Sequence, residues 1–181
     1  QPNLNRYNKL GGEVYLLEER GSGDWSDLES FGYTQKVESM GKVIKNKLKN
    51  SHTIIDEPQV LRSRLFDMII GDWDRHTDQW RWASYEQEDG KTLYKPIPRD
   101  RDQAYAKFDG IANALADYTV PFTRAADKYD GEISKKETTW LNYQARHFDR
   151  LFLTKLTLKD WEQEAKFIQH NLTDAVIEKA I

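Results

Sequence analysis

Apolar residues recur at helical spacing in the first half of the chain and predict two helices. The apolar face of the first helix, residues 34–50, consists of Val37, Met40, Val43, Ile44 and Leu48. Thr34 is a suitable N-cap for this helix. The second helix is expected to begin after Asp56, with Pro58 in its first turn, and to end at Gly71. Its buried face is expected to consist of Leu61, Leu65, Met68 and Ile69.

Runs of aromatic and apolar residues predict strands. Residues 80–85 and 92–97 are such runs, and the Asp89-Gly90 pair between them is typical of the turn of a β-hairpin. A further strand is expected at residues 13–19, a short apolar stretch that follows Gly11-Gly12 and ends in acidic residues. The two predicted helices therefore lie between this strand and the hairpin.

The last third of the chain is predicted to be helical. Residues 134–137 and 157–160 have the pattern of capping boxes, each ahead of an apolar series at helical spacing. Thr173 is expected to cap a short final helix. The predicted fold class is therefore α+β and mostly helical, in a single domain across residues 1–181 of which residues 1–12 are an N-terminal extension.

Composition narrows the classes of function. The chain has 27 basic and 30 acidic side chains in 181 residues, so its net charge of −3 gives no general attraction to nucleic acid. It has no cysteine, which excludes disulfides, thiolate metal sites and a cysteine nucleophile. No apolar run approaches the roughly 18 residues that a membrane helix needs, so we expect no membrane insertion by this segment.

Two acidic clusters flank the predicted hairpin. The first acidic loop, residues 72–79, has four titratable side chains at alternate positions, which point to one side if the segment is extended: Asp72, Asp74, His76 and Asp78. The second acidic loop, residues 98–105, has Asp100 and Asp102, a pair that suits a hard cation such as Mg²⁺ or Mn²⁺. In a purely structural interpretation, these carboxylates instead pair with arginines of the same loops: Arg75, Arg99 and Arg101.

The order of helix, acidic loop, hairpin and acidic loop resembles the C-terminal lobe of protein-kinase-like folds. The resemblance is to the atypical branch that includes HipA-type toxin kinases, spore-coat CotH kinases and secretory-pathway kinases. Residues 68–76, Met-Ile-Ile-Gly-Asp-Trp-Asp-Arg-His, resemble the catalytic loop of these enzymes. The resemblance implies that Asp74 is the catalytic base and that His76 orients the loop.

The cofactors that this resemblance implies are ATP and Mg²⁺ or Mn²⁺, which serve phosphoryl transfer. Asp100 together with Asp102 corresponds to the metal-binding loop, and Gln79 stands at an auxiliary metal position. Residues 13–20 are similar to the hinge between the lobes that holds adenine, which gives two candidate cofactor-binding residues: Glu18 and Glu19.

Two features depart from the kinase pattern. Gln79 stands five residues after Asp74, where these kinases have a metal-binding Asn or Asp. Asp78 could replace it as a ligand, but it lies one position too early in the sequence. The glycine-rich phosphate loop and the strand lysine of an N-terminal lobe have no counterpart before Gly12. We therefore expect a kinase-like C-terminal lobe that is inactive as this fragment and takes part in phosphoryl transfer in the full-length protein.

Two alternatives remain open. One is a non-catalytic interaction or scaffold domain of the pseudokinase type, in which arginines neutralise Asp74, Asp100 and Asp102. The other is a metal-dependent hydrolase or transferase that works without ATP and uses Asp72, Asp74, His76 and Asp100.

Three segments, residues 67–76, 96–105 and 139–149, also resemble part of large envelope proteins of Bacteroidetes. Those proteins combine a calcineurin-like metallophosphoesterase domain, a kinase-like middle part and a surface-antigen barrel. This resemblance implies a periplasmic or outer-membrane-associated location. The expected partners are a nucleotide and the remaining domains of the larger protein.

Overall fold

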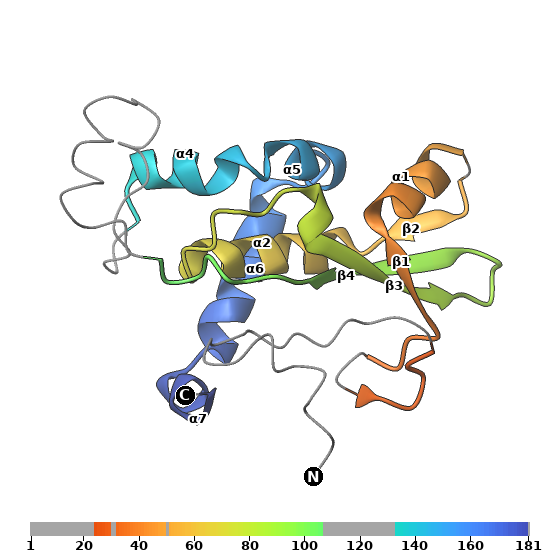
Figure 1. Ribbon diagram of the computed structural model, residues 1–181, viewed down its shortest axis with the longest axis horizontal. Helices are drawn as coiled ribbons and strands as arrows, with labels where there is room; N and C mark the ends of the chain where they lie inside the picture. The colour runs from red at the N-terminus through yellow and green to blue at the C-terminus, as the bar shows by residue number, and fades with distance from the viewer. Residues whose placement is uncertain (1–23, 30–31, 50, 107–132, 181) are drawn as a thin grey trace, which may run out of the picture.

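The computed structural model of the chain describes residues 24–29, 32–49, 51–106 and 133–180 (Figure 1). Within them the fold is α+β, with six α-helices and a four-stranded mixed sheet, and helices take up about half of these residues. The strand predicted at residues 13–19, with Glu18 and Glu19, lies outside the described residues. No helix in the described ranges is long and apolar enough to span a membrane.

The sheet has the strand order β1-β3-β4-β2. Its central pair, β3 (Trp80–Glu86) and β4 (Thr92–Pro98), forms an antiparallel hairpin whose strands agree with the predicted ranges to within one residue. Gly90 has a φ of 75° in the connecting turn, a conformation that glycine adopts without strain. β1 (Lys36–Ser39) pairs antiparallel with β3, and β2 (Thr53–Ile55) pairs parallel with β4.

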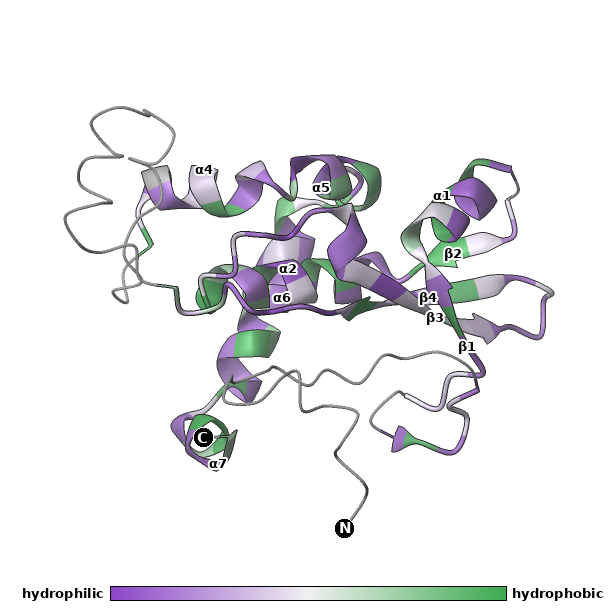
Figure 2. Cartoon of the chain, in the orientation of Figure 1, coloured by the Kyte–Doolittle hydropathy of each residue, from purple (hydrophilic) through white to green (hydrophobic). Residues whose placement is uncertain are grey.

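The α-helices of the described residues are α1 (Met40–Lys49), α2 (Glu57–Ile69), α4 (Lys135–Tyr143), α5 (Arg146–Phe152), α6 (Leu158–Asn171) and α7 (Asp174–Ala180). In Figure 1, α4 and α5 follow one another along one side of the molecule, and α6 packs against α2. The helices carry both hydrophilic and hydrophobic residues (Figure 2), as expected when one face of a helix is buried. A 3-10 turn, η3 (Thr77–Gln79), leads into β3.

The hydrophobic core lies between the hairpin and helices α1, α2 and α5. Trp80 and Trp82, two positions apart on β3, are both fully buried in it. Trp80 stacks on Phe148 with ring centroids 4.2 Å apart, and Trp82 packs on Phe152 with centroids 4.9 Å apart. Such aromatic pairs contribute about 0.5–1.5 kcal/mol beyond the area that they bury. The core therefore fixes the hairpin from whose ends the two acidic loops extend.

Several predicted helix signals are confirmed. The carboxylate of Asp56 accepts the backbone N–H of Gln59 at 3.0 Å at the start of α2. Gly71 follows the end of that helix with a φ of 68°. The capping boxes at residues 134–137 and 157–160 are both present, at the starts of α4 and α6.

Two predictions about the helices are wrong. Residues 36–39 form β1 rather than the first turn of a helix, because pairing with β3 satisfies their backbone groups. Thr34 is buried and its hydroxyl donates to the carbonyl oxygen of Ser84 at 3.2 Å, so it caps no helix. On α2, Leu61 is fully buried as predicted, and Leu65 and Met68 are half-buried, but Ile69 is 38% exposed. The other fully buried side chains of this helix are Val60, Arg64 and Asp67. Two charged residues thus occupy the face that was expected to be apolar.

Candidate active site

The hairpin brings the two acidic loops side by side, and Arg75 of the first loop holds them together. Its Nη1 donates to the carbonyl oxygen of Arg99 at 2.7 Å and to that of Asp100 at 3.3 Å. The backbone N–H of Tyr105 also donates to the carbonyl oxygen of Ile70 at 2.8 Å. The two loops, which are separated in sequence by the whole hairpin, therefore form one structural unit.

Beneath the loops lies a buried ionic network centred on Asp67 of α2. Asp67 is fully buried and pairs with three guanidinium groups: Arg64 at 3.0 Å, Arg75 at 3.3 Å and Arg101 at 2.6 Å. Arg64 pairs in addition with Asp149 of α5 at 2.9 Å. Charges can stay in a protein interior when close partners of opposite sign compensate their desolvation. Because Arg75 and Arg101 belong to different loops, this network attaches both loops to α2.

Asp72 belongs to the buried network and not to the exposed side of the first acidic loop. It is 1% exposed, and its carboxylate lies 3.4 Å from Arg75 and 3.8 Å from Arg101. Neither carboxylate oxygen has a hydrogen-bond partner in the described part of the chain. Burial raises the pKa of Asp72 to about 6, although both arginines favour its charged form. The expectation that it points the same way as Asp74 and His76 is therefore wrong, because Arg75 and Arg101 hold it inside.

Asp74 and His76 lie next to each other and remain accessible. Oδ2 of Asp74 is 4.0 Å from Nε2 of His76, and the two side chains are 28% and 44% exposed. Nδ1 of His76 accepts the backbone N–H of Asp78 at 3.2 Å and thereby caps η3. Nε2 of His76 faces both Asp74 and the amide nitrogen of Gln79, so its role as donor or acceptor depends on the tautomer of the ring. Asp78 itself is exposed and lies 3.4 Å from Arg81.

The predicted metal ligands are divided between the two loops. Gln79 is buried, with its amide nitrogen 3.4 Å from Nε2 of His76. Asp100 and Asp102 lie on the second acidic loop, where Asp102 is exposed. Among the residues that the structure describes, no three His, Asp or Glu side chains are grouped so that they could hold a metal ion. A metal site formed by Asp100, Asp102 and Gln79 therefore stays a prediction.

The second acidic loop has an unusual backbone. Asp100 and Tyr105 have φ angles of 55° and 59°, in the left-handed region that favours glycine. For residues with side chains this conformation costs on the order of 1–3 kcal/mol and persists where surrounding contacts enforce it. Here the contacts come from Arg75, which binds the carbonyl oxygen of Asp100, and from Ile70, which accepts the N–H of Tyr105. Backbone strain of this kind is concentrated at functional sites.

Sequence reasoning did not identify Arg64, Asp67 and Asp149 as supports of the site. The one available signal is the opposite charge of Arg64 and Asp67 at a spacing of three residues on a helix, which places them on one face. The contribution of Asp149 depends on how α5 packs against α2, which helical periodicity does not specify.

Comparisons with known proteins identify no relative, because no family model, no curated protein and no solved structure matches the chain. The chemistry of the site is therefore inferred from the side chains of the two loops and from the groups that hold them.

Proposed function

We propose that this chain is the C-terminal lobe of an atypical kinase-like domain and that the full-length protein transfers a phosphoryl group from ATP with Mg²⁺ or Mn²⁺. The observation that supports this most is the division of the first acidic loop into two sets of side chains. Asp72 and Arg75 are buried in the ionic network, whereas Asp74 and His76 are accessible. Phosphoryl transfer depends mainly on positioning and electrostatics, and a carboxylate on a firmly anchored loop meets that need.

In the proposed reaction, Asp74 accepts a hydrogen bond from the hydroxyl group of the acceptor and takes its proton. The imidazole of His76, whose Nε2 lies 4.0 Å from Oδ2 of Asp74, would limit the orientation of this carboxylate. Asp100 with Asp102 would hold the metal ion, and Gln79 would assist through its amide. The metal ion supplies neutralisation of the negative charge on the phosphate groups.

A non-catalytic scaffold is the second candidate function. It is favoured by the neutral side chain of Gln79, which is buried against His76, and by the absence of a group of three metal-ligating side chains in the described ranges. A hydrolase or transferase that works without ATP has less support. One of its expected ligands, Asp72, is enclosed between Arg75 and Arg101.

Calorimetric titration of Mg²⁺ and Mn²⁺ into the full-length protein, with and without ATP, distinguishes these functions. The kinase proposal predicts that ATP binds only together with the metal ion, and that Asp100→Asn abolishes this binding. Binding of the metal ion alone, with no effect of ATP, would instead indicate the hydrolase or transferase. The absence of heat in every titration would overturn the proposal in favour of a scaffold.

Asp74→Asn is expected to lower the rate of phosphoryl transfer by the full-length protein about 100-fold or more, because the amide cannot take the proton. The fold should be unaffected, since the side chain is partly exposed and keeps its size. The measurement is phosphate transfer from labelled ATP, and Asp78→Asn on the same loop is the matched control, with an expected rate near that of the wild type. An unchanged rate in Asp74→Asn would remove this residue from the mechanism.

A further inference from the structure

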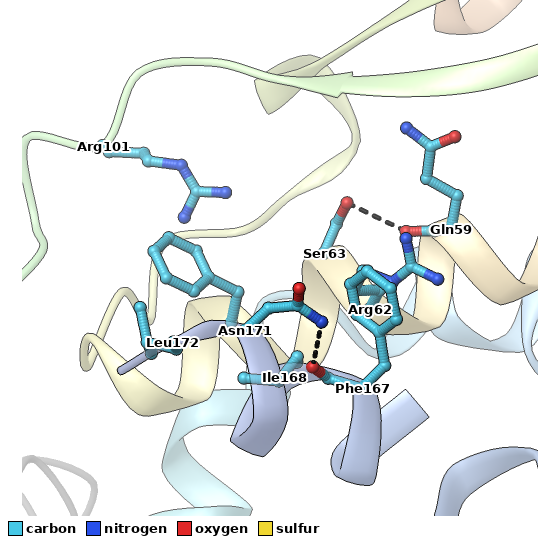
Figure 3. A pocket seen from close by; sticks show the side chains of 9 residues that line it. Gln59, Arg62, Ser63, Arg101, Phe167, Ile168, Asn171 and Leu172 are labelled. Atoms are coloured by element: carbon cyan, nitrogen blue, oxygen red, sulfur yellow. Dashed lines mark hydrogen bonds between the residues drawn. The ribbon is translucent and has the colours of Figure 1, made fainter. Parts of the chain in front are cut away.

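A pocket of about 320 Å³ lies between α2 and the C-terminal half of α6 (Figure 3). Its apolar lining consists of Phe66, Phe167, Ile168 and Leu172. This volume is at the lower end of the range that is usual for small-molecule sites in proteins. None of the residues that we propose for phosphoryl transfer lines it, so the pocket requires its own explanation.

Two uncharged polar side chains of the pocket are already engaged within their own helices. The hydroxyl of Ser63 donates to the carbonyl oxygen of Gln59 at 2.9 Å, and Nδ2 of Asn171 donates to the carbonyl oxygen of Phe167 at 2.7 Å (Figure 3). Ser63 and Asn171 therefore have fewer groups left for a neutral polar ligand, and Gln59 is the remaining uncharged polar residue of the lining. The charged groups that line the pocket are two arginines, Arg62 and Arg101.

Both arginines are held in place by carboxylates and aromatic rings. Nε of Arg62 lies 2.7 Å from Glu164, and its guanidinium group stacks 3.5 Å from the ring centroid of Phe167. Nη1 of Arg101 lies 2.6 Å from Asp67, and its guanidinium group lies 5.2 Å from the ring centroid of Phe66. A guanidinium group has five N–H donors, and each carboxylate uses only part of them. The pocket therefore combines preorganised cationic donors with an apolar lining.

We infer that this pocket binds a small organic anion with a flat apolar body, of which an aryl carboxylate is the simplest example. Its carboxylate pairs with the remaining donors of Arg62, while Arg101, on another side of the pocket in Figure 3, adds positive charge. Its ring covers Phe66 and Phe167. An inorganic anion would leave this apolar lining uncovered, and a neutral aromatic compound would offer no charged acceptor to the remaining arginine donors.

Titration with 2-naphthoate, followed by the backbone amide signals of the ¹⁵N-labelled chain, tests this inference. The signals of Ser63 and Asn171 are expected to shift most, because both residues line the pocket. The neutral analogue 2-naphthylmethanol and inorganic phosphate should each bind at least about 10-fold more weakly, since each lacks one of the two interactions. Equal affinity for 2-naphthoate and for either comparison compound would overturn the inference.

A paired substitution tests the role of Arg62. The double variant Arg62→Gln with Glu164→Gln removes both charges, so that no largely buried carboxylate is left without a partner. We expect it to bind 2-naphthoate about 10-fold more weakly. The matched control is the ion pair between Asp78 of η3 and Arg81 of β3, which does not line the pocket. We expect unchanged binding in Asp78→Asn with Arg81→Gln.

Phe167→Leu provides an independent test if the double variant folds poorly. Phe167 is 43% exposed, so the substitution should preserve the fold while it removes the aromatic ring from the pocket. We expect a several-fold loss of affinity for 2-naphthoate. If neither this variant nor the double variant weakens binding, or if the control pair weakens it as much, the proposed site is wrong.

Discussion

Replacing Asp72 with asparagine is expected to stabilise the protein at neutral pH and to have little effect in acid. Folding raises the pKa of Asp72 from 3.8 to about 6, because its carboxyl group is buried. Between these two pH values the native state binds more protons than the unfolded state, so the free energy of unfolding falls as the pH rises. At 1.36 kcal/mol per pH unit, the loss is roughly 3 kcal/mol once the pH exceeds the folded pKa. Asparagine carries no charge and avoids this loss.

Urea unfolding of both proteins at several pH values from about 4 to 8 measures the effect. The charged groups that face Asp72 are Asp67, Arg64, Arg75 and Arg101. They are present in both proteins, so the difference between the two stability curves isolates the titration of Asp72. Asp102→Asn, on the exposed side of the second acidic loop, is the control, with an expected change below about 0.5 kcal/mol. If Asp72→Asn is less stable than the wild type at pH 8, pairing with the arginines outweighs desolvation and the reasoning fails.

Two further substitutions test the supports of the site by urea unfolding. Asp67→Asn is expected to lower the free energy of unfolding by roughly 3–5 kcal/mol, because three guanidinium groups lose a shared buried partner. The control is the exposed Asp78→Asn, and a loss no greater than that of the control would contradict this prediction. Trp80→Ala is expected to cost roughly 3–5 kcal/mol, because it removes a fully buried ring from its stack on Phe148. Leu48→Ala, at a position that is 80% exposed, serves as its control, and similar losses for the two would place Trp80 outside the core.

Local signals predicted those parts of the fold that depend on neighbouring residues. Asp56 caps α2 and Gly90 turns the hairpin through backbone groups only a few positions away, so composition and spacing are sufficient to identify them. β1 was not predictable in the same way, because its pairing partner β3 comes much later in the chain. β2 was missed for the same reason, since it pairs with β4.

The sequence predicted where the candidate site lies, but not which of its charged side chains are buried and which are accessible. A hairpin returns the chain beside its starting point, so its two flanking loops come together. Hydrophobic periodicity, however, assigns charged residues to solvent, whereas Asp67 and Asp72 are buried against arginines from both loops. Such ion pairs depend on tertiary packing. Because of this packing, Asp72 is buried against Arg75 while Asp74 remains accessible.

Arg101 belongs both to the pocket and to the second acidic loop, so binding at the two places can be coupled. Its side chain lines the pocket between α2 and α6, while its backbone lies between Asp100 and Asp102 in the second acidic loop. If the loop holds a metal ion and the pocket holds an organic anion, a shift of the loop caused by one ligand alters the site of the other. Linkage then requires reciprocity: the factor by which Mn²⁺ changes the affinity for 2-naphthoate must equal the factor by which 2-naphthoate changes the affinity for Mn²⁺. Arg101 would thereby couple the affinities of two separate binding sites.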